Sequence, residues 1–194
     1  MKFPALAASV LCAAVAVGAD AHTVVYRASL DGASEAPPNA SPATGWARVT
    51  FDLDLVTMRV EASFSGLLGN TAAAHIHCCT TDAGTGTSGV ATQVPTFTGL
   101  PLGVTFGAMD QTFDLTQASS YNPTFITNNG GTVGGAMNAL LAGSAEGKAY
   151  FNLHTSQFPG GEIRGFLVPV PEPSTWALMA LGLFGTLAAA RRRA

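Results

Sequence analysis

Residues 44–65 read TGWARVTFDLDLVTMRVEASFS and contain the strongest secondary-structure signal of the chain. Apolar side chains alternate with polar ones through most of it, which is the period of two of a half-buried antiparallel strand. The first run, 47–55, and the second, 58–64, follow each other closely enough to predict a β-hairpin. The positions expected on the buried face are Ala47, Val49, Phe51, Leu53, Leu55, Met58, Val60, Ala62 and Phe64.

Five further stretches show weaker alternation, and loops rich in Gly, Pro, Thr, Ser and Asn separate them. Many short strands with such punctuation predict an all-β protein, an antiparallel Greek-key β-sandwich or barrel. Residues 136–145, AMNALLAGSA, contain helix formers and no β-branched residue, which predicts one short helix. Segment 79–110 has many glycines and few strand signals, and such long loops often carry function. The weaker strands are expected at 23–30, 73–78, 111–115, 148–155 and 162–168.

The N-terminus has the features of a secretory signal peptide. Lys2 precedes an apolar run over 3–17, and the small residues Ala19 and Ala21 stand where signal peptidase requires them. We therefore expect residues 1–21 to be removed on export.

The C-terminus carries a second hydrophobic segment. Residues 171–173, Pro-Glu-Pro, precede an apolar stretch over 176–190 and then three arginines at 191–193. The stretch is shorter than the ~20 residues that usually cross a bilayer, but its Trp176 and the snorkelling arginines extend its reach. The arginines are expected on the cytoplasmic side, so the tail would hold the preceding domain outward as a short transmembrane segment.

This tail closely resembles the PEP-CTERM sorting signal of Gram-negative bacteria, with Pro171, Glu172 and Pro173 as its motif. The resemblance implies an exosortase-type partner, which cuts near the motif and delivers the protein to the cell surface or extracellular matrix. It also implies contact with the membrane only before processing. The expected organisation is a signal peptide at 1–21, a β domain at 22–168 and a sorting signal at 169–194.

The predicted domain is acidic. Within residues 22–168, five Lys and Arg side chains oppose ten Asp and Glu, which gives a net charge of −5. A chain without a basic patch cannot release counterions from phosphates, so nucleic acid is excluded as a partner.

A histidine pair stands out in the sequence His75-Ile76-His77-Cys78-Cys79. Residues two apart on a strand point to the same face, so His75 and His77 would project together. Two imidazoles form half of a transition-metal site, and His154 is the candidate third ligand because His22 becomes the N-terminal residue. The alternative is that these histidines are structural groups held by hydrogen bonds.

Cys78 and Cys79 are the only cysteines of the predicted domain. Because exported thiols are usually oxidised, we expect a disulfide between these neighbours, with pairing to another chain or thiolate ligation beside His77 as alternatives. No set of nucleophile and partners is evident, and no serine stands in a G-x-S-x-G context, so the sequence does not indicate a hydrolase.

Glu162 and Arg164 share one face of the last predicted strand. If that face is exposed, an ion pair between them would contribute little. If Arg164 instead lies beside the histidines, it could attract an anion to them.

Six motifs occur in order along the chain: LDG at 30–32, EAPP at 35–38, ATG at 43–45, AHIH at 74–77, YFNLHT at 150–155 and PGGEIRG at 159–165. Together they resemble the CHRD domain, a repeat first named in chordin and found alone in exported bacterial proteins. The resemblance spans about 28–167 and implies an extracellular role; in chordin the domain accompanies binding of signalling proteins. The Cys78-Cys79 pair is extra to this pattern.

The chain is also similar to copper/zinc superoxide dismutases in its H-x-H strand, late third histidine and following arginine. This likeness implies a superoxide-dismutase-like fold, with an immunoglobulin-like sandwich as the other form, and a copper site on His75, His77 and His154 guided by Arg164. No histidine here can bridge to a zinc ion, so dismutase activity is not expected.

Two functions follow from the sequence. The first is a noncatalytic protein of the cell surface or matrix that binds an extracellular polymer or a surface protein. The alternative is a copper-binding or redox protein that uses the three histidines.

Overall fold

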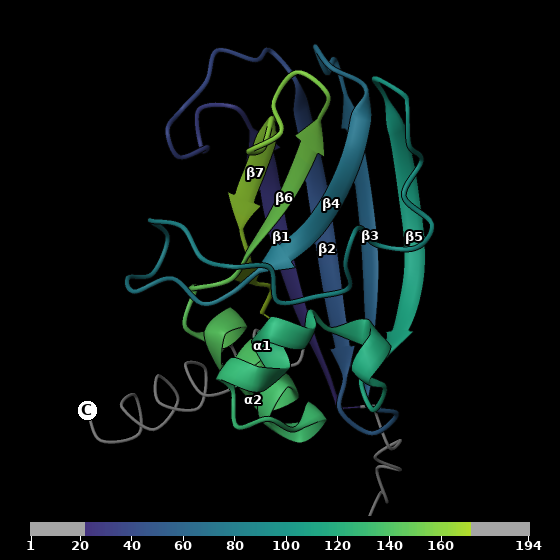
Figure 1. The fold of residues 1–194 in the computed structure, drawn as a ribbon, viewed down its shortest axis with the longest axis vertical. Coiled ribbons are helices and arrows are strands. Elements are labelled where there is room, and N and C mark those ends of the chain that lie inside the picture. The colour runs from purple at the N-terminus through teal and green to yellow at the C-terminus, as the bar shows by residue number, and fades with distance from the viewer. Residues whose placement is uncertain (1–21, 172–194) are drawn as a thin grey trace, which may run out of the picture.

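The computed structural model describes residues 22–171, which form a curled antiparallel sheet with few helices (Figure 1). This architecture confirms the predicted all-β fold. The strands are β1 Thr23–Asp31, β2 Thr44–Asp52, β3 Thr57–Ser65, β4 Thr71–His77, β5 Gly107–Asp114, β6 Tyr150–Thr155, β7 Ile163–Phe166 and β8 Val168–Pro169. The helices are α1 Pro123–Asn128 and α2 Val133–Ala145, with a 3-10 turn at Ala118–Ser120.

The strand order is β4-β6-β7-β1-β2-β3-β5, with β8 paired to β1. Strands β1, β2 and β3 form a meander, and the chain then crosses from β3 to β4 at the opposite edge and returns to β5. These crossings bring β4 beside β6, although more than 70 residues separate the two strands in sequence. The site described below depends on that pairing.

The inner face of the curled sheet forms the core, and the helices close one of its ends (Figure 1). Phe51, Met58, Ile76 and Phe151 are fully buried there. Burial of each such side chain contributes roughly 1.5–3 kcal/mol, so the apolar positions of the alternating strands supply most of the stability.

The hairpin predicted from residues 44–65 is confirmed, with β2 and β3 paired from Thr44 opposite Ser65 to Asp52 opposite Thr57. The expected burial of Leu53 and Leu55 is wrong, because these side chains are 46% and 72% exposed in the turn after β2. The Asp52 carboxylate accepts hydrogen bonds from the backbone N–H groups of residues 54 and 55 and so ends the strand.

The helical region is longer than the sequence indicated. α2 begins at Val133, where the Thr132 side chain caps it by accepting from the Gly135 N–H. The sequence did not predict α1, which Asn122 caps and which carries Pro123 in its first turn.

The long segment between β4 and β5 lies along the free edge of β4. The Ala91 N–H donates to the Ile76 carbonyl, and the Phe97 N–H donates to the Ala74 carbonyl. This segment therefore covers an edge strand that would otherwise expose unpaired backbone groups, and it brings its own carbonyl groups to the outer face of β4.

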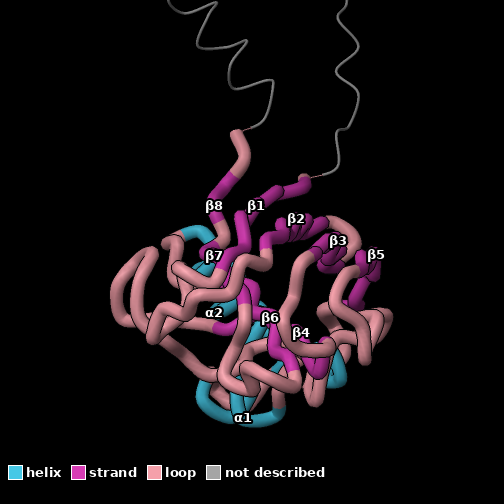
Figure 2. The backbone as a smooth tube through the Cα atoms, turned by 90° about the horizontal axis from the view of Figure 1, so that it is seen from above, coloured by secondary structure: helices cyan, strands magenta, loops and turns pink. Residues whose placement is uncertain are grey.

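The two ends of the described chain lie together, because β8 pairs with β1 (Figure 2). The predicted signal peptide at 1–21 and the predicted transmembrane segment at 176–190 fall outside the described residues. Within residues 22–171, no helix is long and apolar enough to cross a membrane.

Candidate metal centre

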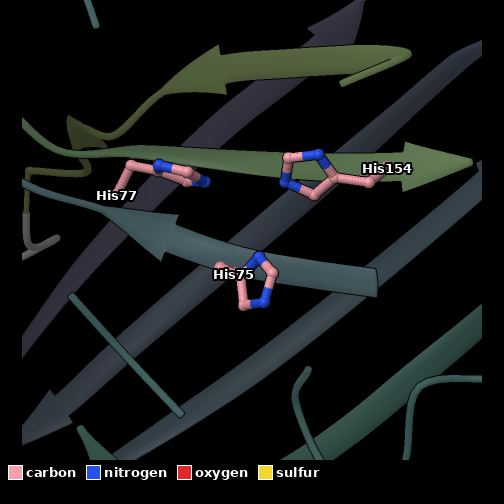
Figure 3. A group of neighbouring side chains, drawn as sticks. All are labelled: His75, His77 and His154. Carbon is pink, nitrogen blue, oxygen red and sulfur yellow. The ribbon is translucent and has the colours of Figure 1, made fainter. Parts of the chain in front are cut away.

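The three histidines meet on the outer face of β4 and β6 (Figure 3). His75 lies opposite Asn152 in the register of these strands, and Ala73 lies opposite His154. Their neighbour Ile76 points to the opposite face and is fully buried in the core. The strand period that places Ile76 inside therefore places His75 and His77 together outside, as the sequence predicted.

The rings are close enough to share one ion. The centroid of the His154 ring is 5.3 Å from that of His75 and 5.7 Å from that of His77, and the His75 and His77 centroids are 5.8 Å apart. One nitrogen from each ring lies within 4.8 Å of the other two. Ligands at ~2 Å from a metal stand ~3.4 Å apart in tetrahedral geometry, so small ring rotations complete the contact.

Each ring has one nitrogen held by a backbone carbonyl. His75 Nε2 lies 2.7 Å from the Pro95 oxygen, and His77 Nδ1 lies 2.9 Å from the Ser88 oxygen. His154 Nδ1 lies 3.0 Å from the Pro159 oxygen. A carbonyl only accepts, so these three nitrogens carry the hydrogens and the tautomer of each neutral ring is fixed.

The other three nitrogens have no partner. His75 Nδ1, His77 Nε2 and His154 Nε2 are buried without a hydrogen bond. A purely structural role would leave these acceptors without a protein partner, and a buried acceptor that nothing satisfies costs about 1–3 kcal/mol. A metal-bound histidine, by contrast, donates its other ring N–H to a carbonyl or carboxylate in just this way.

The histidine site also favours uncharged rings. Burial lowers the pKa of His77 to about 4 despite its hydrogen bond to Ser88, and the charges of His154, His75 and Arg164 act in the same direction. Burial, with the charge of His75, lowers the pKa of His154 to about 4, and burial lowers that of His75. At neutral pH the three rings therefore present lone pairs, which metal ligation requires.

Tyr150 on β6 lies between His77 on β4 and Arg164 on β7. The Tyr150 and His77 rings stack with centroids 4.8 Å apart at 9°, and the Arg164 guanidinium carbon lies 4.8 Å from the Tyr150 centroid. Arg164 also donates from Nε to the Ser34 carbonyl and from Nη1 to the Gly86 carbonyl at 3.0 Å. Arg164 is thus held by its neighbours one strand away from the histidine-bearing face of β4, with the Tyr150 ring between it and His77.

Of the two alternatives for Glu162 and Arg164, the exposed pair is wrong, because both side chains are buried. The ion-pair partner of Arg164 is Glu35, at 3.8 Å between Nε and Oε2. Sequence reasoning did not single out Glu35, because no local pattern shows that a residue of the EAPP segment folds onto β7.

Glu35 is itself strongly perturbed. Burial raises its pKa to about 7, and the charge of Arg164 and a hydrogen bond from the Ala36 backbone only partly oppose this. Its Oε1 atom and Asn152 Oδ1 are both buried without a hydrogen bond, and both lie 2.6 Å from where a β-carbon on Gly161 would stand. Only glycine fits this position, where φ is also +130°.

Glu162 holds the turn between β6 and β7. Its carboxylate accepts from the Ser41 hydroxyl at 2.7 Å and from the Thr155 hydroxyl at 2.7 Å. It also accepts from the backbone N–H groups of residues 68 and 69. Because Pro159 belongs to this turn, Glu162 helps to fix the carbonyl that orients His154.

Cys78 and Cys79 form a disulfide with each other. Their sulfur atoms lie against α2, near the Ala139 carbonyl and the α-carbon of Gly143. Within residues 22–171, the one group of potential metal ligands that converges contains the three histidines and no cysteine.

Comparison with known proteins identifies two segments. Residues 26–167 match the CHRD domain, and residues 169–193 match the PEP-CTERM protein-sorting motif. The chain therefore belongs to the CHRD domain family, and its sorting motif marks an exported protein that exosortase-type machinery directs to the cell envelope or surface. No curated protein matches the chain. No solved structure matches it either.

Proposed function

We propose that this exported CHRD domain binds a transition metal ion, with copper as the first choice, through His75, His77 and His154. One observation carries the proposal: three buried ring nitrogens without partners converge, while the opposite nitrogen of each ring faces a carbonyl. The arrangement supplies both the ligands and the groups that orient them.

The ligand set favours copper or zinc over harder ions. Neutral imidazoles suit these metals, whereas Mg²⁺ and Ca²⁺ prefer carboxylate and carbonyl oxygens. Among divalent ions, Cu²⁺ binds most strongly to such a nitrogen set. Three protein ligands leave a coordination position for water or an anion.

The surroundings fit a site that holds a metal at the cell surface. His154 is only partly buried, so the ion would approach from its side. The positive charge of Arg164 would favour an anion at the open position, which is the guiding role expected from the sequence. This proposal takes the histidine alternative of the sequence and assigns the domain a binding role without turnover.

Metal binding can be tested on the exported chain purified without a His-tag. After loading with Cu²⁺ or Zn²⁺ and removal of excess ion, elemental analysis should find about one ion per chain, and nitrogen ligation should appear in the EPR spectrum of the copper form. Variants His75→Ala, His77→Ala and His154→Ala should each lose the bound ion while circular dichroism shows an unchanged fold.

His22→Ala is the matched control because it removes the remaining histidine of residues 22–171 and leaves the cluster intact. It should retain the metal. Loss of binding in His22→Ala with retention in the three cluster variants would overturn the proposal and place the ion at the N-terminus.

A further inference from the structure

A second polar surface lies on the outer face of β1, β2 and β3, separate from the histidines. Trp46 is at its centre and is 49% exposed. In the sheet register, Trp46 lies between Ser29 on β1 and Ser63 on β3. Because both neighbours are small, they leave the large aromatic ring uncovered, which is unusual for a tryptophan.

The adjacent row of this surface is charged. Arg27 lies opposite Arg48, and Arg48 lies opposite Glu61. Three of the five basic side chains in residues 22–168 point outward here: Arg27, Arg48 and Arg59. Asp31, Asp52 and Glu61 share this face, so the local excess of positive charge is confined to the neighbouring pair Arg27 and Arg48.

The three arginines differ in how closely acidic side chains pair with them. Arg59 forms a two-point hydrogen bond with the Asp110 carboxylate, at 2.7 and 2.5 Å, and its Nη2 lies 3.3 Å from Glu61. Arg48 lies only within ion-pair distance of Glu61, at 3.7 Å, and Arg27 has no ion pair within the described residues. The guanidinium groups of Arg27 and Arg48 are therefore largely available to bind an anionic ligand.

Two buried polar atoms at this surface lack hydrogen bonds, Arg48 Nε and Glu61 Oε2. Other atoms of Arg48 and Glu61 line a hollow of about 400 Å³ together with Arg27, Ser29 and Trp46. An arginine without an ion pair in the described chain, a second arginine held only by a 3.7 Å ion pair and a half-exposed tryptophan beside one open hollow indicate a ligand that combines a negative charge with an apolar face.

We infer that this hollow binds an acidic sugar residue, a uronic acid within a polysaccharide. The sugar carboxylate would accept from Arg27 and Arg48, as guanidinium groups favour charge-assisted, two-point binding of carboxylates. A sugar hydroxyl would donate to Glu61. The C–H groups on one face of the sugar ring would pack on Trp46, whose ring face carries partial negative charge.

Tri-galacturonate is the probe, with maltotriose as the uncharged sugar and a glutamate-rich peptide as the non-sugar anion. Isothermal titration of the full exported chain should detect tri-galacturonate alone, with affinity that falls as salt is added. Trp46→Ala, Arg27→Gln and Arg48→Gln should each weaken binding about tenfold or more, as expected for central contacts of a small site.

Two controls separate the site from general surface effects. Phe106→Ala removes an aromatic side chain that is 72% exposed elsewhere, and Lys148→Gln removes a positive charge outside the hollow. Both should bind as the unchanged chain does. Equal binding of the peptide, binding that survives Trp46→Ala, absence of tri-galacturonate binding, or a Trp46-dependent dimer in sedimentation would each overturn the inference.

Discussion

The two nitrogens of each site histidine have different environments, and this difference governs their chemistry. In His77, Nδ1 donates to the Ser88 carbonyl, whereas Nε2 is buried without a partner. In His75 the roles of the nitrogens are reversed, because Nε2 faces the Pro95 carbonyl. Backbone carbonyl groups of the segment between β4 and β5 and of the β6–β7 turn thus determine which nitrogen of each ring is available to a metal.

This arrangement predicts the tautomers and the titration of the metal-free chain. Nitrogen-15 NMR at about pH 5.5 should show His77 and His154 neutral with hydrogen on Nδ1, where an exposed histidine is mostly protonated. A folded pKa of about 4 means that the contribution of these rings to stability is complete above pH ~6.5 and is lost as pH falls toward 4. Titration of His77 near its unperturbed pKa would contradict this.

At the scale of elements, α2 is fitted against the disulfide that follows β4. A β-carbon on Gly143 would stand 2.3 Å from the sulfur atoms of both Cys78 and Cys79. Leu140 on the same helix is fully buried in the core, so the helix cannot move away without loss of packing. Gly143 is therefore required by this close approach and not by backbone conformation.

Gly143→Ala should lower the free energy of unfolding by about 1–3 kcal/mol, measured by chemical denaturation, because the added methyl group overpacks the contact. Gly134→Ala is the matched control, since a β-carbon on Gly134 meets nothing within 4 Å, and it should stabilise α2 by up to about 1 kcal/mol. In a Cys78→Ala/Cys79→Ala background the Gly143→Ala penalty should shrink. An unchanged penalty there would assign it to another contact.

At the scale of the whole molecule, the histidine site joins parts of the chain that lie far apart in sequence. β4 provides two rings, β6 provides the third, and the segments that contain Ser88, Pro95 and Pro159 provide the carbonyl groups. Unfolding separates His154 and the three carbonyl groups from the His75–His77 pair, so a metal ion that binds all three rings binds the native state in preference to the unfolded chain.

Copper should therefore raise the melting temperature of the exported chain. Free metal at about 100 times the dissociation constant adds about 2.7 kcal/mol to the free energy of unfolding, or roughly 5–10 °C for a domain of this size. Scanning calorimetry of the His75→Ala/His77→Ala/His154→Ala variant should show no such rise. An equal rise in both proteins would mean that the ion stabilises through another site.

Local patterns in the sequence were enough to predict a hairpin, the shared face of two histidines and the sorting motif. The alternation in residues 44–65 specified a hairpin, and the same period put His75 and His77 on one face of β4. The sorting motif was also evident, because a short local motif suffices for recognition by the sorting machinery. Such features depend only on neighbours in the chain.

The tertiary structure decided what depends on strand order and burial. It brought His154 beside β4 and paired Arg164 with Glu35, and it buried Glu162 and Arg164, whose exposure the sequence left open. It also ended β2 before Leu53, where the Asp52 side chain competes with the sheet for backbone hydrogen bonds. The end of β2 is a local turn that the alternation pattern concealed. The other outcomes follow from contacts between distant segments, whose pairing and solvent exposure are set by the packing of the complete sheet and carry no signal in local periodicity.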